Sequence, residues 1–350
     1  MYQRLFDSLE EINVKEDVYV FTDRNYNIDN EYSSNIYISK SYDKIDRFLF
    51  HLKHTKVLND IQRKLKINNY TIMHAHSLFS NGYIAYKLNQ KYKIPYIVAV
   101  RNTDINIFFK KMIHLRRLGI KIFKNAEKIV FLSESYKEYT LDKFIPAKHK
   151  KEIKNKAIVI PNGIDKFWLN NKAEESFKSK YKKTNLIYVG NIDSNKNIET
   201  TVKTCKLLIE QGYKVNYKVI GKVKNKNYMN IIEKYEFIKY IPYCQKEELI
   251  EYYRNSDIFI MPSKHETFGL VYAEAMSQGL PVIYTRGQGF DGQFNEGEVG
   301  YSVDCMDEYE IADKILKIKE NYSEISNRCI KLVDRFDWDN ISELYSEVYD

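Results

Sequence analysis

The sequence predicts an α/β protein built from two doubly wound, Rossmann-like domains that face each other across a cleft. A length of 350 residues is typical of about two domains. A hydrophobic fraction of 44% is enough for a core in each of them. In both halves, short β-branched or aromatic runs alternate with amphipathic stretches, which is the pattern of a parallel sheet covered by helices.

The first half has strand signals at residues 17–21, 35–39, 71–76, 96–100 and 128–133. Helical patterns occupy residues 42–66, 81–92 and 108–125. The segment 157–165, AIVIPNGID, closes this half with a strand and an Asn-Gly turn. The polar stretch 170–183 is interpreted as the linker region.

The second half repeats the alternation. Its strand signals lie at residues 185–190, 217–221, 257–263 and 281–285. Its helical patterns lie at residues 198–211, 228–235, 247–256, after Phe268, 309–321 and 339–348. Ligands of doubly wound sheets bind outside the carboxyl ends of the strands, so we expect the functional residues there.

The beginning of the chain lacks one unit that this fold predicts. A doubly wound domain normally opens with a strand, a glycine-bearing turn and a helix. Here the chain starts inside a helical pattern, and no glycine precedes Gly82. We therefore expect that a leading strand and loop of roughly two to three dozen residues are missing, through a late assigned start codon or a true truncation.

The composition argues against several classes of protein. A charge of +8 with 30 tyrosines is compatible with nucleic-acid binding. However, Lys, Asn, Ile and Tyr are frequent throughout, which indicates a coding bias, so no nucleic-acid partner is expected. The four cysteines lack metal-ligand spacing, and the start lacks a signal-peptide pattern. With no apolar window of roughly 18 residues, we expect a cytoplasmic protein, at most peripheral on the inner face of a membrane.

Residues 262–282, PSKHETFGLVYAEAMSQGLPV, read as the end of a strand, a loop, a helix and the start of another strand. The loop lies at the carboxyl edge of the sheet, where the first amides of the helix suit anionic oxygens. Gly269 would let a ligand approach the backbone closely. Glu274, held among apolar side chains, needs a pair of donors such as a ribose diol. The alternative is that Glu266 is an ordinary loop carboxylate and that Glu274 forms a salt bridge with a lysine.

This block resembles the E-x7-E signature of retaining glycosyltransferases with the GT-B fold, the large family 4 group. Three further segments carry the resemblance: IVIPNGID, LIYVGNIDSNKNIE and FDWDNISELY. The resemblance implies an acceptor-side domain at residues 1–165 and a nucleotide-sugar domain at residues 166–335. It also implies that the terminal helix, residues 336–350, crosses back to the first domain.

The resemblance also implies roles for individual residues. Glu266 would contact hydroxyls of the transferred sugar, and Lys196 would neutralise the departing diphosphate, where charge builds in the transition state. The backbone of residues 268–270 would hold the sugar and diphosphate, and Glu274 the ribose. The full donor-binding set is Glu274, Phe268, Gly269, Leu270, Gly190, Asn191, Gly221 and Ile241. No metal or other cofactor is implied.

The sequence departs from the family pattern at two places. Asn191 stands where the family usually has an arginine, which leaves Lys196 without a bidentate partner unless Arg286 or Arg101 compensates. Arg101-Asn102-Thr103-Asp104 replaces a common His-Gly pair. Gly287 and Gly289 still offer amides to the sugar.

Two histidines and an acidic pair complete the candidates. His74 and His76 end a strand without further ligands at zinc spacing. His76 either contacts the acceptor, together with Arg101 and Asn102, or is a packed, hydrogen-bonded histidine. The D-x-D at residues 337–339 is read as structural, with Asp339 as a helix N-cap.

The resemblance therefore implies a retaining glycosyltransferase that moves a sugar from a UDP- or GDP-linked donor to a saccharide, as in a lipid-linked precursor of a cell-surface polysaccharide. The basic amphipathic stretch 105–128 either contacts an anionic membrane or covers a sheet with its lysines in water. Two alternatives stay open: an inactive sugar-nucleotide-binding partner subunit, and a GT-B-shaped nucleotide-sugar epimerase.

Overall fold

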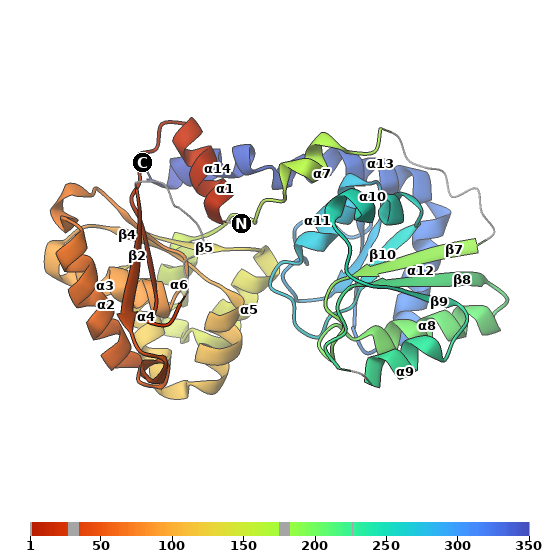
Figure 1. Ribbon diagram of the computed structural model, residues 1–350, viewed down its shortest axis with the longest axis horizontal. Helices are drawn as coiled ribbons and strands as arrows, with labels where there is room; N and C mark the ends of the chain where they lie inside the picture. The colour runs from red at the N-terminus through yellow and green to blue at the C-terminus, as the bar shows by residue number, and fades with distance from the viewer. Residues whose placement is uncertain (1, 27–34, 175–182, 226, 350) are drawn as a thin grey trace. The chain divides into compact units, whose positions relative to one another are not determined.

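The computed structural model describes residues 2–26, 35–174, 183–225 and 227–349 (Figure 1). The contacts between residues divide the chain into two compact units. The carboxy-terminal unit contains residues 161–341 and residues 133–136. The amino-terminal unit contains the rest, including the last residues of the final helix. Most of the linker expected at residues 170–183 falls outside the described residues.

The amino-terminal unit contains two separate parallel sheets. β3 to β6 form a four-stranded sheet in the order β3-β4-β5-β6, and β1 pairs with β2 alone. The strands are β1 (Val18–Asp23), β2 (Ile36–Tyr42), β3 (Met73–Ala75), β4 (Tyr96–Ala99), β5 (Lys128–Phe131) and β6 (Ala157–Val159). All four residues of β4 are buried, as expected for a central parallel strand.

The helices of this unit differ from the expectation in several places. They are α1 (Tyr2–Glu11), α2 (Phe50–Lys64), α3 (Ser80–Tyr92), α4 (Arg116–Asn125), α5 (Glu134–Phe144) and α6 (Ala147–Lys156). The predicted helix 42–66 begins only at Phe50, because Tyr42 ends a strand and a capping box of Asp43 and Asp46 starts a short 3-10 helix. The predicted helix 108–125 is divided into a π-helix, a 3-10 turn and α4.

Two helices, α5 and α6, were not expected at all. α6 has a single buried residue, Ile153, so its sequence AKHKKEIKNK lacks the apolar stripe by which a helix is recognised. No helix in the described part of the chain is both long and apolar enough to cross a membrane.

The carboxy-terminal unit is built on one six-stranded parallel sheet with the order β12-β11-β10-β7-β8-β9. Its strands are β7 (Lys183–Val189), β8 (Lys214–Ile220), β9 (Ile238–Ile241), β10 (Ile258–Met261), β11 (Val282–Thr285) and β12 (Gly300–Val303). β9 (IKYI) and β12 (GYSV) were not predicted, because each lacks the continuous apolar run that marks β10 (IFIM).

The helices of this unit are α7 (Lys166–Asn170), α8 (Ile198–Glu210), α9 (Asn227–Glu233), α10 (Lys246–Arg254), α11 (Leu270–Ser277), α12 (Glu308–Glu320) and α13 (Tyr322–Leu332). The final helix, α14 (Trp338–Tyr349), begins in this unit, and its residues from Ser342 on belong to the amino-terminal unit. α14 begins at Trp338, so Asp337 occupies the N-cap position and accepts a hydrogen bond from the Asp339 amide at 3.2 Å. The expectation that Asp339 is the N-cap was therefore wrong by two positions. Asp339 instead forms an ion pair with Lys166 at 3.1 Å.

Candidate active site

Three predicted donor-binding residues lie side by side at the carboxyl ends of β7, β8 and β9. The Gly190 amide donates to the Ile220 carbonyl, and the Gly221 amide donates to the Ile241 carbonyl, both at 3.0 Å. A Cβ on Gly221 would lie 2.0 Å from the Gly190 carbonyl oxygen, so only glycine lets the two turns approach so closely. Ile241 is buried, and its carbonyl oxygen accepts the hydrogen bond from the Gly221 amide. Ile241 therefore supports the turn at Gly221 through its backbone.

A cavity of about 440 Å³ opens at this edge of the sheet. Its lining includes Gly190, Asn191, Gly221, Lys222, Lys246 and Glu274. Glu274 projects into it from α11. Burial, and then the negative charge of Asp165, raise the pKa of Glu274 to about 7. The cavity therefore presents a carboxyl group that exchanges its proton near neutrality.

An ion pair that the sequence did not indicate lines the same cavity. Lys246 Nζ lies 3.0 Å from Asp165 Oδ2, and Asp165 also caps α7 by accepting from the Phe167 amide at 2.8 Å. The cap position of Asp165 was recognisable from its place before a helical stretch. Lys246 carried no local signal, because its partner lies 81 residues away.

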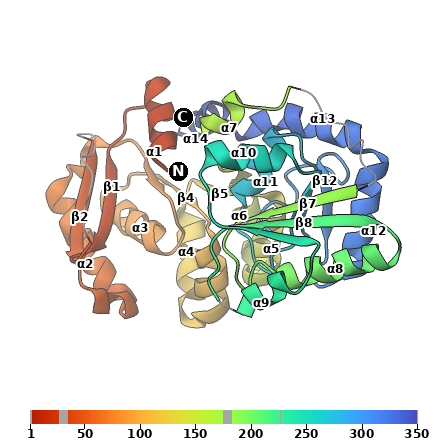
Figure 2. The same cartoon turned by 45° about the vertical axis from the view of Figure 1, so that its right-hand side comes forward.

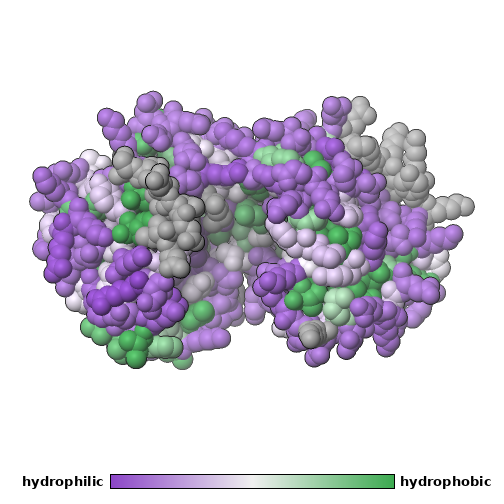
Figure 3. Space-filling model, in the orientation of Figure 1, coloured by the Kyte–Doolittle hydropathy of each residue, from purple (hydrophilic) through white to green (hydrophobic). Residues whose placement is uncertain are grey.

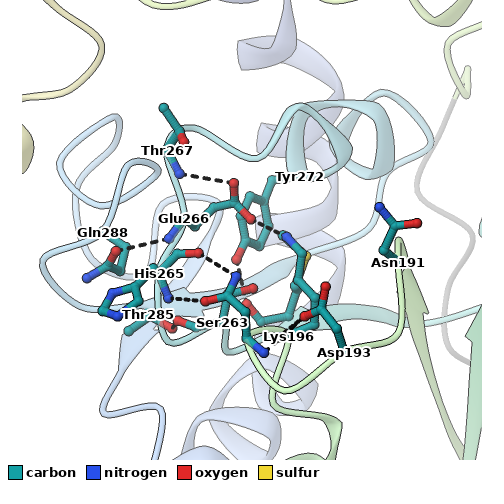
Figure 4. A network of polar contacts seen from close by, with 12 residues as sticks. Asn191, Asp193, Lys196, Ser263, His265, Glu266, Thr267, Tyr272, Thr285 and Gln288 are labelled. Carbon is teal, nitrogen blue, oxygen red and sulfur yellow. Dashed lines mark hydrogen bonds and ion pairs between the residues drawn. The ribbon is translucent and has the colours of Figure 1, made fainter. Parts of the chain in front are cut away.

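Glu266 and Lys196, the two predicted catalytic residues, are in direct contact (Figure 4). Lys196 Nζ lies 2.5 Å from Glu266 Oε2, and both side chains keep less than a fifth of their surface exposed. The other carboxylate oxygen of Glu266 accepts from the Thr267 amide at 3.0 Å. The amide of Glu266 donates to Gln288 Oε1 at 3.0 Å, so Gln288, which was not singled out in the sequence, holds the loop.

The loop that carries Glu266 is also tied to the turn that carries Lys196. Asn195 accepts from the Lys264 and His265 amides and donates to the His265 carbonyl, over 2.8 to 3.0 Å. Gly289 passes so close to Thr267 that a Cβ would lie 1.7 Å from the Thr267 carbonyl oxygen. These backbone contacts fix the spacing of the ammonium and the carboxylate without relying on their own attraction.

The segment 268–270 connects the loop to α11 in two ways. Phe268 is buried and packs against Phe336 and Phe290, so its side chain belongs to the core. Gly269 is the N-cap of α11 with φ +73°, where a Cβ would collide with the Tyr272 ring. The segment therefore offers a ligand its backbone and the N-terminus of α11.

The two arginines considered as compensation for Asn191 are engaged elsewhere. Arg286 pairs with Glu310. Arg101 belongs to the amino-terminal unit, where its Nε donates to the His76 carbonyl at 3.2 Å. Within the carboxy-terminal unit, Lys222 and Lys246 are the cations that line the cavity.

The candidate acceptor residues cluster in the amino-terminal unit. The rings of His74 and His76 are 4.0 Å apart, and His74 Nδ1 lies 2.8 Å from the Tyr349 hydroxyl. Burial lowers the pKa of His76 well below its ordinary value. Asn102 accepts a hydrogen bond from the side chain of Asn106.

Asp104, next to these candidates, has a structural role that the sequence did not indicate. Its buried carboxylate accepts from the amides of Leu78, Phe79 and Arg101 at 2.9 to 3.0 Å. It thereby connects the turns after β3 and β4. The described residues contain no group of three or more His, Cys, Asp or Glu side chains that could hold a metal ion.

Two family models match the chain one after the other. The model described as Glycosyltransferase Family 4 matches residues 15–166, and that described as Glycosyl transferases group 1 matches residues 169–333. The chain belongs to the GT-B glycosyltransferases. This glycosyltransferase is 33% identical over 205 residues to the capsular polysaccharide biosynthesis glycosyltransferase CapM of Staphylococcus aureus. The matched part is 55% of this chain and 52% of CapM, so the chain spans about half the length of that relative.

Solved structures agree with the fold of this glycosyltransferase. Sucrose-phosphate synthase from Thermosynechococcus elongatus superposes with a TM-score of 0.73 at 19% identity, covering 99% of this chain and 91% of that one. Anabaena Alr3699/HepE, solved in complex with UDP-glucose, gives a TM-score of 0.65 at 14% identity, covering 95% and 99%. At these identities the likeness shows the fold.

Proposed function

We propose that the chain transfers a sugar from a nucleotide diphosphate donor to a saccharide acceptor with retention of the anomeric configuration. The observation that carries the proposal is the contact between Lys196 and Glu266, at the same sheet edge as the cavity of Gly190, Gly221 and Glu274. A cation, a hydroxyl-binding carboxylate and a ribose-binding carboxylate are the groups that a nucleotide sugar requires.

The donor would lie with its nucleoside in the cavity and its diphosphate near the N-terminus of α11. Ionised Glu274 would accept hydrogen bonds from the ribose hydroxyls, and the close turns at Gly190 and Gly221 would let the nucleotide approach the backbone. The UDP-glucose complex of the HepE structure supports a uridine donor. A guanosine donor is the other candidate, and a thermal-shift screen of both sugar classes separates them.

The reaction would proceed on one face of the sugar. The bond between the anomeric carbon and the diphosphate oxygen breaks as the acceptor oxygen bonds to that carbon, and the departing phosphate takes the acceptor proton. Lys196 would stabilise the charge that grows on the phosphate, and Glu266 would hold the sugar hydroxyls. No metal is needed in this scheme.

The acceptor is proposed to be a lipid-linked precursor of a cell-surface polysaccharide, which fits the capsular role named for CapM. An exposed apolar surface on the amino-terminal unit supports an acceptor held in a membrane. Phe48 is 88% exposed and Ile113 is 63% exposed. We call the following group the apolar tip: Ile45, Phe48, Leu49, Leu52, Ile107 and Ile113. Figure 3 shows hydrophobic residues gathered at the lower end of this unit.

The two segments of the apolar tip are neighbours in space. The Phe50 and Phe108 rings, one from each segment, are 6.1 Å apart. Lys111 and Arg117 are exposed nearby in the sequence. α4 itself buries Ile122 and Phe123, so it covers the core, and the segment before it is the part that would meet a membrane.

The test is transfer by the purified chain from UDP- and GDP-sugars to a lipid-linked saccharide, with the anomeric configuration of the product read by NMR. We expect an unchanged configuration and loss of transfer in Glu266→Gln. Glu324→Gln, which removes a surface carboxylate of the same unit paired with Arg328, is the matched control and should keep full activity. An inverted product contradicts the retaining mechanism. An isomerised nucleotide sugar without an acceptor indicates an epimerase.

A further inference from the structure

One wall of the cavity that Glu274 lines is formed by the short helix α7, which connects α10 with α11. The Asn171 carbonyl oxygen, at the end of α7, accepts hydrogen bonds from Arg254 of α10 at 3.0 Å and from Gln278, after α11, at 3.1 Å. Figure 2 shows α7 beside these two helices. The place of Asp165, which precedes α7 and lines the cavity, is therefore fixed by both neighbours.

Lys246 of α10 holds the Asp165 carboxylate from the other side. Lys246 Nζ lies 3.0 Å from Asp165 Oδ2 and 4.9 Å from the centre of the Phe167 ring. Asp165 Oδ1 accepts a hydrogen bond from the Phe167 amide at 2.8 Å and so caps α7. Each oxygen of the Asp165 carboxylate thus has a donor. The cap explains why a negative charge stands at this point of the cavity, and Lys246 supplies the matching positive charge.

Glu274 shares the cavity with this ion pair but has no partner of its own among the residues described. Its carboxylate forms no hydrogen bond or ion pair with any residue that the structure describes. Burial raises the pKa of Glu274 most, and the charge of Asp165 raises it further. Two carboxylates that face one cavity oppose each other's ionisation. The charge state of Glu274 therefore depends on how well the charge of Asp165 is balanced.

The other charged or titratable groups around the cavity act less strongly on Glu274. Lys222 lines the cavity as a second cation, but it is exposed to water. Burial raises the pKa of the Cys244 thiol and that of the Tyr253 hydroxyl, so both groups stay protonated and uncharged at neutral pH. The lining also contains the polar side chains of Asn191, Tyr243 and Gln245. Among these neighbours, Asp165 is therefore the charge that acts most strongly on Glu274.

The elements packed on the other sides of α11 direct their charges elsewhere. They are β11, α13 and the 3-10 helix Val333–Phe336. The Tyr284 hydroxyl of β11 stays protonated, because burial raises its pKa. Lys331 of α13 is exposed to solvent. The other charged groups of the two helices have partners of their own: Arg328 pairs with Glu324, Asp334 pairs with Lys172, and Arg335 donates to the Gln293 carbonyl.

We propose that Lys246 is a positioning residue of the donor site, whose ion pair with Asp165 balances the charge beside Glu274 and lets ionised Glu274 receive the ribose diol. An isolated carboxylate opposes the ionisation of a second one nearby, whereas a carboxylate paired with an ammonium presents a dipole, whose field falls off faster with distance. The Lys246 and Asp165 side chains are 37% and 29% exposed, so water and salt screen the pair only in part. The role of the diol rests on the proposed function, but the coupling of Lys246 to Glu274 is a property of the free protein.

The test follows the ionisation of Glu274 in the full chain without nucleotide, by NMR of the glutamate side-chain carboxyl carbons. The Glu274 resonance is assigned by its loss in Glu274→Gln. We expect Lys246→Met to raise the pH midpoint of this resonance by about one unit. Asp165→Asn, which keeps a residue able to cap α7, should lower the midpoint, and the double variant should return it toward the wild-type value. Lys317→Met, which removes a lysine paired with Asp313 at 3.0 Å outside the cavity lining, is the matched control and should leave the midpoint unchanged.

The pH dependence of donor binding separates this role from direct contact with the donor. If Glu274 must be ionised to bind the diol, Lys246→Met should weaken the binding of UDP-glucose by about fivefold at about pH 7 and by less than about twofold at about pH 9, because the apparent affinity follows the ionised fraction. A calorimetric titration at each pH measures both changes.

The proposal is overturned if the Glu274 midpoint is the same in Lys246→Met and in the wild type, or if the double variant shifts it as far as Lys246→Met alone. An equal loss of affinity at both pH values also overturns it, and would mean that Lys246 contacts the donor directly. If the midpoints move as expected but neither UDP-glucose nor GDP-mannose binds to the wild type, the proposed function fails while the coupling stands, so the two failures are distinguishable.

Discussion

At the scale of single residues, Glu274 combines burial with a position in the cavity lining. In the role proposed for it, a pKa of about 7 means that a proton must leave before the carboxylate can accept hydrogen bonds from a ribose diol. The raised pKa also sets a stability trend. The folded state holds this proton more tightly than the unfolded state, so the contribution of Glu274 to stability is greatest below its ordinary pKa of 4.5 and declines as the pH rises toward 7.

We expect the affinity for UDP-glucose, whose phosphates do not titrate in this range, to depend on pH through Glu274. Between about pH 8 and about pH 6 the affinity should fall by about tenfold, because the protonated fraction grows. Calorimetric titration at a series of pH values measures this. Glu274→Gln should bind more weakly and with a flat profile, and a wild-type profile that is equally flat would contradict the ribose role.

Lys196 should affect the chemical step more than donor binding. The charge on the departing diphosphate is greatest in the transition state, so Lys196→Met should lower kcat by about 10²–10³-fold with a smaller change in KM. Lys172→Met is the matched control, since it removes a lysine that pairs with Asp334 in the same unit. A change confined to KM would mean that Lys196 only binds the ground state.

The sequence foresaw the site best where spacing is local. Glu266, Gly269 and Glu274 fall in one short block, and the structure places them along a loop and the helix that follows. Two other contacts could not be predicted, because they form between residues far apart in the sequence. They are the ion pair of Lys246 with Asp165 and the hydrogen bond from the Glu266 amide to Gln288. The roles of the donor-binding set and of His76, Arg101 and Asn102 stay predictions.

At the scale of elements, the carboxyl ends of β7 and β8 lie so close together that Gly221 has no room for a side chain. Gly221→Ala would force its Cβ onto the Gly190 carbonyl oxygen, whereas a Cβ on Gly212, also at positive φ, would meet nothing within 4 Å. We expect Gly221→Ala to lower the free energy of unfolding by about 2–4 kcal/mol and Gly212→Ala by about 1 kcal/mol. Urea unfolding of both variants checks this, and equal losses would mean that the backbone angle alone decides.

The apolar tip gives a second test at this scale. Phe48→Asp and Ile113→Asp should each weaken binding to vesicles that contain anionic lipid, because each puts a charge where acyl chains would be met. Leu344→Asp, on an exposed apolar residue of α14, is the control and should bind as the wild type does. Cosedimentation at low salt measures the difference. If the wild-type protein does not bind such vesicles, the proposed contact with a membrane is contradicted.

Element prediction succeeded where the apolar pattern is strong and failed where another force decides. The buried runs of β4 and β10 were placed correctly. The stretch 108–125 has one apolar pattern but three helical geometries, and the π-helix among them begins at Asp104, whose carboxylate accepts hydrogen bonds from the neighbouring turns. Short strands such as β12 are defined by their pairing with a neighbouring strand, here β11, which the local sequence does not indicate.

At the scale of the whole molecule, the prediction of two α/β units on parallel sheets was confirmed, and the amino-terminal unit has two sheets where one was expected. The separation of β1 and β2 from the sheet of β3 to β6 depends on the three-dimensional packing, which the sequence pattern does not indicate.

The most direct test of the donor site is a calorimetric titration of the wild-type protein with UDP-glucose and GDP-mannose, repeated on Glu274→Ala. We expect one nucleotide sugar to bind at one site, with an affinity about tenfold or more weaker in the variant. Binding of neither sugar by the wild type, or equal affinity in the variant, would contradict the account.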